Sequence, residues 1–114
     1  MEGRRLPPMR LHLDKPWIPL DSEHVALVPG QLGVFQLADA SGSVVYVGYA
    51  GGRSLFGLRS ELSVRIGAAS TFRYEVNMQY QTRYREQLML HQGANGALPI
   101  MNQAEAPISL GRLG

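Results

Sequence analysis

The side chains that could do chemistry in this sequence include a tyrosine hydroxyl, an arginine and a glutamate, groups that together suit a phosphate ester. Tyr46 lies in an apolar, β-branched run, and its hydroxyl can donate a hydrogen bond to a phosphate or to an attacking water. Residues 39–42 predict a turn, so we expect Phe35 and Tyr46 directly opposite each other on one sheet face. The structural alternative is that the two rings only stabilise the hairpin.

Arg59 lies on the apolar side of a helix predicted over residues 55–67. At about 100° per residue, its direction falls inside the apolar arc, which consists of Leu55, Leu58, Leu62 and Ile66. A guanidinium aimed at a sheet needs a partner or a cavity, because an unpaired buried charge is costly. We therefore expect Arg59 to line a cleft. The alternatives are a structural ion pair, or a side chain that extends outward along its stem.

Glu86 lies in the middle of a second helix, predicted over residues 80–92 with its end near Gly93 or Gly96, and Arg83 precedes it on the same helix. A lone carboxylate can hold Mg²⁺ where a substrate phosphate and waters complete the coordination octahedron. The alternative is a solvated ion pair with Arg83, worth a few tenths of a kcal/mol. Periodicity favours the ion pair, because Glu86 lies off the apolar face, which consists of Tyr80, Tyr84, Leu88 and His91.

These side chains depend on a small set of elements in the order β-β-α-β-α. Residues 33–38 and 43–49 predict a hairpin, and residues 71–78 alternate as a half-buried strand. Together with the helices over 55–67 and 80–92, they predict an α+β domain. The economical architecture is a small three-stranded, mostly antiparallel sheet with helices packed on it.

Residues 1–29 predict an N-terminal arm, and residues 30–114 the domain itself. The arm carries several prolines and ends in a short helical turn, capped by Asp21 or Ser22. The tail from Leu98 also carries prolines and is predicted to be irregular.

Composition excludes several classes of protein. The chain has 114 residues, enough for one hydrophobic core, and self-association as a homodimer is as compatible with this size as a monomer. The absence of cysteine excludes a disulfide framework, a thiolate zinc site and a cysteine nucleophile. No apolar run approaches the roughly 20 residues of a membrane span, and no secretory signal is evident, so we expect a cytoplasmic location. The net charge of +2 does not by itself indicate a nucleic-acid partner.

Two short motifs in the hairpin carry a family resemblance. Gly33-Val34-Phe35 and Tyr46-Val47-Gly48 resemble the two halves of the signature of the GIY-YIG nuclease superfamily. Within this resemblance, Arg59 is similar to the arginine of the first helix and Glu86 to the metal-binding glutamate of a later helix. Asn102 is similar to the asparagine that closes many such domains.

The resemblance covers about residues 30–103 and implies a divalent-metal-dependent endonuclease acting on DNA or RNA. It implies that Glu86 holds Mg²⁺ or Mn²⁺ and that an arginine stabilises the developing charge, with Arg53 competing with Arg59 for that role. Phe35 replaces the signature tyrosine, so water activation would pass to Tyr46, Tyr49 or bulk hydroxide. Losing a general base typically costs ~10²–10⁴-fold in rate.

A second hypothesis is a non-catalytic derivative that keeps the fold and binds nucleic acid, a nucleotide or a protein partner. Tyr49, Arg53 and Asn102 are the expected binding residues. The stretch over residues 46–54 is similar to that of small uncharacterised prokaryotic proteins.

Overall fold

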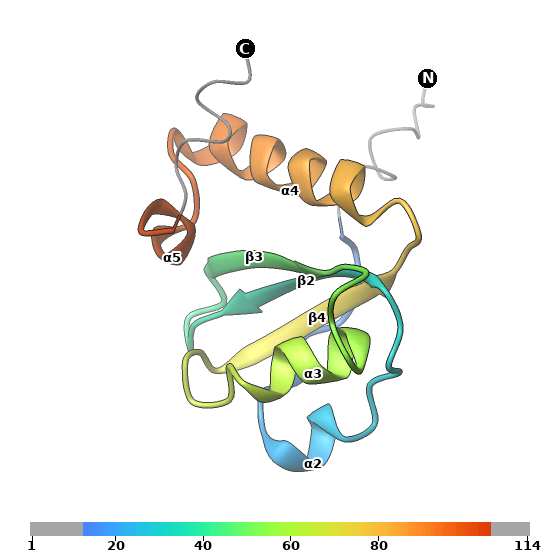
Figure 1. The fold of residues 1–114 in the computed structure, drawn as a ribbon. Coiled ribbons are helices and arrows are strands. Elements are labelled where there is room, and N and C mark those ends of the chain that lie inside the picture. The colour runs from blue at the N-terminus through green and yellow to red at the C-terminus, as the bar shows by residue number, and fades with distance from the viewer. Residues whose placement is uncertain (1–12, 106–114) are drawn as a thin grey trace, which may run out of the picture.

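A four-stranded antiparallel sheet in the order β1-β4-β2-β3 forms the centre of the molecule, with helices on both of its faces (Figure 1). The computed structural model describes residues 13–105. Its elements are β1 (Ile18–Pro19), α2 (Ser22–Val25), β2 (Gly33–Ala38), β3 (Val44–Ala50), α3 (Gly57–Ser63), β4 (Thr71–Val76), α4 (Tyr80–Asn95) and α5 (Ile100–Gln103).

The predicted α+β class and the antiparallel sheet with packed helices are confirmed. The sheet has one strand more than expected, because β1 pairs with β4 through Ile18 and Phe72. A two-residue strand is too short to leave a period in the sequence. The described part of the predicted arm also joins the core, since Leu20, Val25 and Val28 pack in the same buried cluster as the sheet.

The register of the hairpin differs from the prediction by two residues. Tyr46 pairs with Leu37, and Phe35 pairs with Gly48. The loop takes residues 39–43, one more than expected, and a β-bulge after Leu37 adds another. A shift of two residues preserves the faces. The expectation of direct opposition was therefore wrong, whereas Phe35 and Tyr46 do share a face, with ring centroids 5.9 Å apart.

The face of the sheet toward α3 carries the apolar core. Phe35, Leu37 and Phe72 pack there against Leu58 and Leu62 of α3. Gly48 belongs to this packing, because a Cβ at its position would lie 2.4 Å from the Phe35 ring. Gly48, in the motif Tyr46-Val47-Gly48, therefore makes room for the ring of Phe35, in the motif Gly33-Val34-Phe35.

Helix α3 is shorter than predicted, and this changes which of its apolar residues are buried. It begins at Gly57 and ends at Ser63. Leu58 and Leu62 are fully buried as expected, whereas Leu55 is 80% and Ile66 41% exposed because both lie outside the helix.

The opposite face of the sheet meets α4 through polar side chains. Gln36 of β2 donates to Gln87 of α4 at 2.9 Å, and both are buried. Arg83, also buried, forms ion pairs with Glu75 of β4 and Glu86 of its own helix. The predicted apolar face of α4 also meets the sheet in part, since Leu88 is buried and Tyr80 and Tyr84 pack on Tyr49 of β3. The polar network widens the contact, because Arg83 and Gln87 turn toward the sheet as well.

The C-terminal part of the described chain is more regular than expected. Helix α4 ends where predicted, with Gly96 in the left-handed conformation. The segment after Leu98 forms the short helix α5, where an irregular tail was predicted, and α5 packs on β3. Of the helices in residues 13–105, none has the length and apolar character needed to cross a bilayer.

Candidate functional site

A cavity lies along the outer edge of β3, and we call it the β3-edge pocket. Its volume is about 680 Å³, within the range of small-ligand sites. The loop 51–54 lies at this pocket, between β3 and α3. The other polar and aromatic side chains that line it are Tyr46, Tyr49, Glu61, Arg65, Tyr80, Gln81, Tyr84 and Glu105.

Tyr46, Arg65 and Glu105 form one wall of the pocket. The Tyr46 hydroxyl donates to Glu105 Oε2 at 2.8 Å, and an Arg65 nitrogen donates to the same hydroxyl at 3.5 Å. Burial, with a smaller effect of the Glu105 hydrogen bond, raises the pKa of Tyr46 to about 12. Tyr46 is therefore a neutral hydrogen-bond donor at physiological pH.

The Arg65 guanidinium is held in place from two sides. Its Cζ lies 5.3 Å from the centroid of the Tyr46 ring and 5.4 Å from that of Phe35, as in cation–π contacts. Glu61 accepts from it at 3.1 Å through a carboxylate oxygen, and that carboxylate also accepts from Ser54 at 2.7 Å. The result is a cation with a fixed position beside Tyr46.

Tyrosine rings form a second wall of the pocket. Tyr49 stacks on Tyr80 with centroids 5.6 Å apart, and it meets the edge of Tyr84 at 4.8 Å. Tyr49 is 41% exposed, so part of its ring remains open to a ligand. The Tyr80 hydroxyl accepts from the backbone of Gly52 at 3.3 Å. The pKa of Tyr84 is also raised, mainly by burial and to a smaller extent by the charge of Glu105. The Tyr84 hydroxyl is therefore neutral as well.

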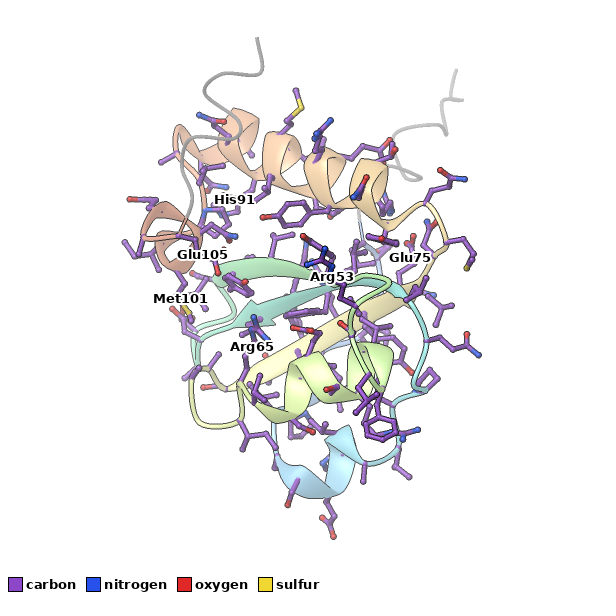
Figure 2. All side chains as sticks on the ribbon, in the orientation of Figure 1. Arg53, Arg65, Glu75, His91, Met101 and Glu105 are labelled. Carbon is purple, nitrogen blue, oxygen red and sulfur yellow. The ribbon has the colours of Figure 1, made fainter. Side chains whose placement is uncertain are left out.

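Arg53 provides an accessible cation at this pocket. It is exposed, and within residues 13–105 it has no hydrogen-bond or ion-pair partner. In Figure 2, Arg53 lies between two parts of the molecule, with α4 on one side and the sheet and α3 on the other. A guanidinium in this position is free to contact an anionic ligand.

Arg59 lies outside this pocket, so the structure does not bring it together with Tyr46. Its Nε donates to the carbonyl of Val28 at 2.9 Å. The reason is that its side chain follows α3 toward the segment between α2 and β2. Arg65 stands beside Tyr46 instead. Sequence reasoning missed Arg65 because it lies off the predicted apolar arc, although its spacing of four from Glu61 indicated an ion pair.

Glu86 also lies outside the β3-edge pocket. It pairs with Arg83 at 3.0 Å, the alternative that its position off the predicted apolar face favoured. The expected cleft with Tyr46, Arg59 and Glu86 together is therefore not formed, because Arg83 turns toward the sheet and draws Glu86 to the Glu75 side of α4. The Arg83 guanidinium already pairs with this carboxylate, and Glu86 belongs to no group of three or more potential metal ligands within residues 13–105, so the described side chains here do not fit a Mg²⁺ or Mn²⁺ site.

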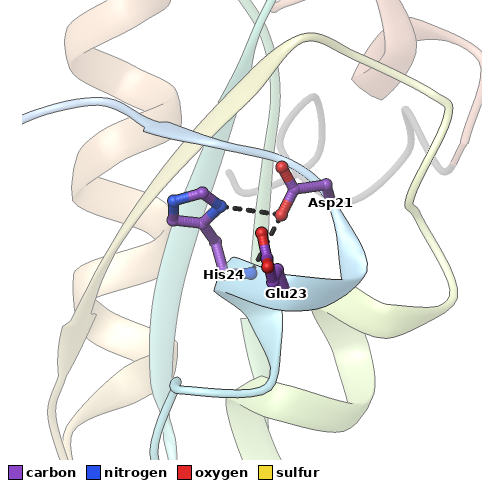
Figure 3. A group of neighbouring side chains, drawn as sticks. All are labelled: Asp21, Glu23 and His24. Atoms are coloured by element: carbon purple, nitrogen blue, oxygen red, sulfur yellow. Dashed lines mark hydrogen bonds and ion pairs between the residues drawn. The ribbon is translucent and has the colours of Figure 1, made fainter.

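One group of potential metal ligands occurs elsewhere in residues 13–105. Asp21, Glu23 and His24 lie at the start of α2, with ligand atoms within 4.8 Å of one another (Figure 3). Asp21 Oδ1 already accepts from the His24 backbone at 2.9 Å and contacts its ring Nδ1 at 2.7 Å. These contacts make Asp21 the N-cap of α2, one of the two residues predicted for that position.

Asn102 lies behind the pocket wall and contacts the backbone of β3. Its Oδ1 accepts from Val47 N–H at 2.8 Å, and its Nδ2 donates to Val47 C=O at 2.9 Å. Its side chain therefore occupies the position of a further strand at the sheet edge. This contact holds α5, and with it Glu105, against the pocket.

Comparison with known proteins identifies one family. The model of a domain of unknown function, DUF7508, matches residues 9–94. No curated protein and no solved structure matches the chain. The matched segment includes β2, β3, α3 and most of α4, whereas Asn102 and Glu105 lie beyond it. Since the match spans more than half of the sequence, the chain belongs to the DUF7508 family.

Proposed function

We propose that this domain binds single-stranded nucleic acid at the β3-edge pocket, with a base on Tyr49 and a phosphate on Arg53. The observation that carries the proposal is that one pocket of about 680 Å³ holds a partly exposed tyrosine and an arginine that has no partner among residues 13–105. Aromatic stacking contributes about 1–3 kcal/mol per base and tolerates every base. A guanidinium contacts phosphate oxygens through its planar fork.

The same chemistry argues for few phosphate contacts. Among residues 13–105, the pocket lining contains two arginines and two glutamates, Arg53, Arg65, Glu61 and Glu105, and the formal charges of these four side chains sum to zero. The whole chain carries only +2. We therefore expect stacking to contribute much of the affinity, with a shallow salt dependence of about −0.7 in log K per log salt for each phosphate contact.

Binding is favoured over metal-dependent hydrolysis by the position of the carboxylates. The GIY-YIG resemblance supports nucleic acid as the ligand. However, Glu86, the residue that the resemblance assigns to the metal, is paired with Arg83 and lies away from the pocket. The two carboxylates inside the pocket are already hydrogen-bonded, Glu105 to Tyr46 and Glu61 to Arg65. Tyr46 and Arg65 could therefore orient a phosphate there as hydrogen-bond donors.

The test is fluorescence anisotropy with a labelled oligo-dT and a labelled oligo-rU. We expect Tyr49→Ala to weaken binding by ~5- to 150-fold, the equivalent of about 1–3 kcal/mol. Tyr49→Phe keeps the ring and should bind like the natural protein. Arg53→Ala should reduce the salt slope by about 0.7. Arg85→Ala is the control, because Arg85 is exposed on α4 outside the pocket, and this substitution should leave the salt slope unchanged.

Two outcomes would contradict the proposal. One is a failure of the natural protein to bind either probe at millimolar concentration. The other is binding that Tyr49→Ala and Arg53→Ala leave unchanged while circular dichroism shows folded protein. Incubation of the same probes with Mg²⁺ or Mn²⁺ tests the alternative, because cleavage that Glu86→Gln abolishes would favour hydrolysis.

A further inference from the structure

We propose that the Glu105 carboxylate occupies a second phosphate position of the β3-edge pocket, in addition to the one at Arg53, so that a ligand phosphate must displace Glu105 to bind there. The proposal rests on the proposed function in one respect, namely that the ligand carries a phosphate. It adds a specific anion site, formed by the Tyr46 hydroxyl and the Arg65 guanidinium, and a competing group from the chain itself.

The anion site consists of donors that do not move easily. Tyr46 is buried, and its hydroxyl points at Glu105 Oε2 over 2.8 Å. Arg65 is stacked on two rings and tied to Glu61, with one nitrogen turned to the same hydroxyl. Donors fixed in this way bind an anion without the cost of ordering them first.

Glu105 differs from these donors, because it is only loosely held. It is exposed and follows the end of α5. Of the described residues, Tyr46 alone forms a side-chain hydrogen bond with its carboxylate. Asn102 fixes α5 upstream, so Glu105 can leave the pocket while the helix remains on β3.

Charge also supports a displaceable carboxylate. With Glu105 in place, the two arginines of the pocket are matched by two glutamates. When Glu105 leaves, the charged side chains that remain in the described lining are Arg53, Arg65 and Glu61, with a formal charge of +1. A phosphate that enters then restores the balance, as expected for an anion that replaces an internal one.

The experiment measures the affinity of a 5′-phosphorylated oligo-dT and the ability of inorganic phosphate to compete with it. Glu105→Ala should raise the oligonucleotide affinity by about 2- to 12-fold, the factor that corresponds to one competing hydrogen bond. Phosphate should compete more strongly by a similar factor. Glu105→Gln, which removes the charge but keeps an acceptor for Tyr46, should give a smaller gain.

Glu23→Ala is the matched control, because it removes one exposed negative charge on α2, outside the pocket. If Glu105→Ala and Glu23→Ala raise the oligonucleotide affinity equally, net charge alone explains the gain, and the proposal is overturned. No gain, or a loss, in Glu105→Ala would overturn it too. If Tyr49→Ala still weakens binding in that case, the proposed function stands without the competing carboxylate. In addition, Tyr46→Phe should abolish the gain from Glu105→Ala, since it removes the donor that both anions share.

Discussion

Asn102→Ala is expected to destabilise the domain more than its place at the end of the described chain suggests. The side chain is 4% exposed and forms two hydrogen bonds to Val47, at 2.8 and 2.9 Å, and Val47 is itself fully buried. Alanine leaves a buried N–H and a buried C=O without partners. Each such group costs about 1–3 kcal/mol, so the free energy of unfolding should fall by about 2–6 kcal/mol.

Urea unfolding measures this change. With a slope of about 2 kcal/mol per molar urea, the middle of the range for a small domain, the midpoint should fall by about 1–3 M. Gln103→Ala is the matched control, because Gln103 is the exposed neighbour whose amide bonds only to Leu98 C=O. It should change the free energy of unfolding by less than about 0.5 kcal/mol. A loss below about 1 kcal/mol in Asn102→Ala would refute the idea that its amide takes the place of a strand.

Two further predictions concern a glycine pair and an acid-sensitive ion pair. Gly57→Ala should lower the free energy of unfolding by at least about 1 kcal/mol, because φ is +54° and a Cβ would lie 2.4 Å from Gln31 O. Gly93→Ala, where a Cβ meets open space in α4, should raise it by roughly 0.5–1 kcal/mol. Thermal unfolding that moves both variants in the same direction would contradict this reasoning. Burial alone would raise the pKa of Glu75, but hydrogen bonds from Arg83 and Asn77 outweigh it and hold the pKa below its ordinary value of 4.5. A lowered pKa means that this stabilisation is complete above pH 4.5 and is lost as pH falls through the folded-state pKa. Glu75→Gln should therefore flatten the decline of stability in urea titrations below pH 4.5, and an unchanged decline would exclude Glu75 as a source.

Much of the local structure could be predicted because its causes lie within a few residues. β-Branched runs bounded by turn residues predicted both strands of the hairpin, and the alternation of side chains placed Phe35 and Tyr46 on one face. Asp21 as an N-cap and Gly96 as a helix end were predictable for the same reason. Each depends on a backbone group one helical turn away.

The candidate site could be predicted only in part. Tyr46, Tyr49 and Arg53 line one pocket, as do Tyr80 and Tyr84, which the sequence indicated only as a helix face. Arg59 and Glu86 were expected with them and lie elsewhere. Periodicity defines a face within one helix, but it does not define how that helix is rotated against the sheet.

The sequence by itself determined the α+β class, the hairpin and the types of side chain available for contact with a phosphate. Only the tertiary structure decided which of them meet. Tyr46 and Glu105 are separated by 59 positions, and Val47 and Asn102 by 55, yet each pair is in hydrogen-bond contact. The polar network beneath α4 likewise brought Arg83 to the sheet, where it pairs with Glu75 of β4. Such pairings depend on how separate elements dock, and docking is set by the packing and hydrogen-bond requirements of the whole chain, which no local pattern records.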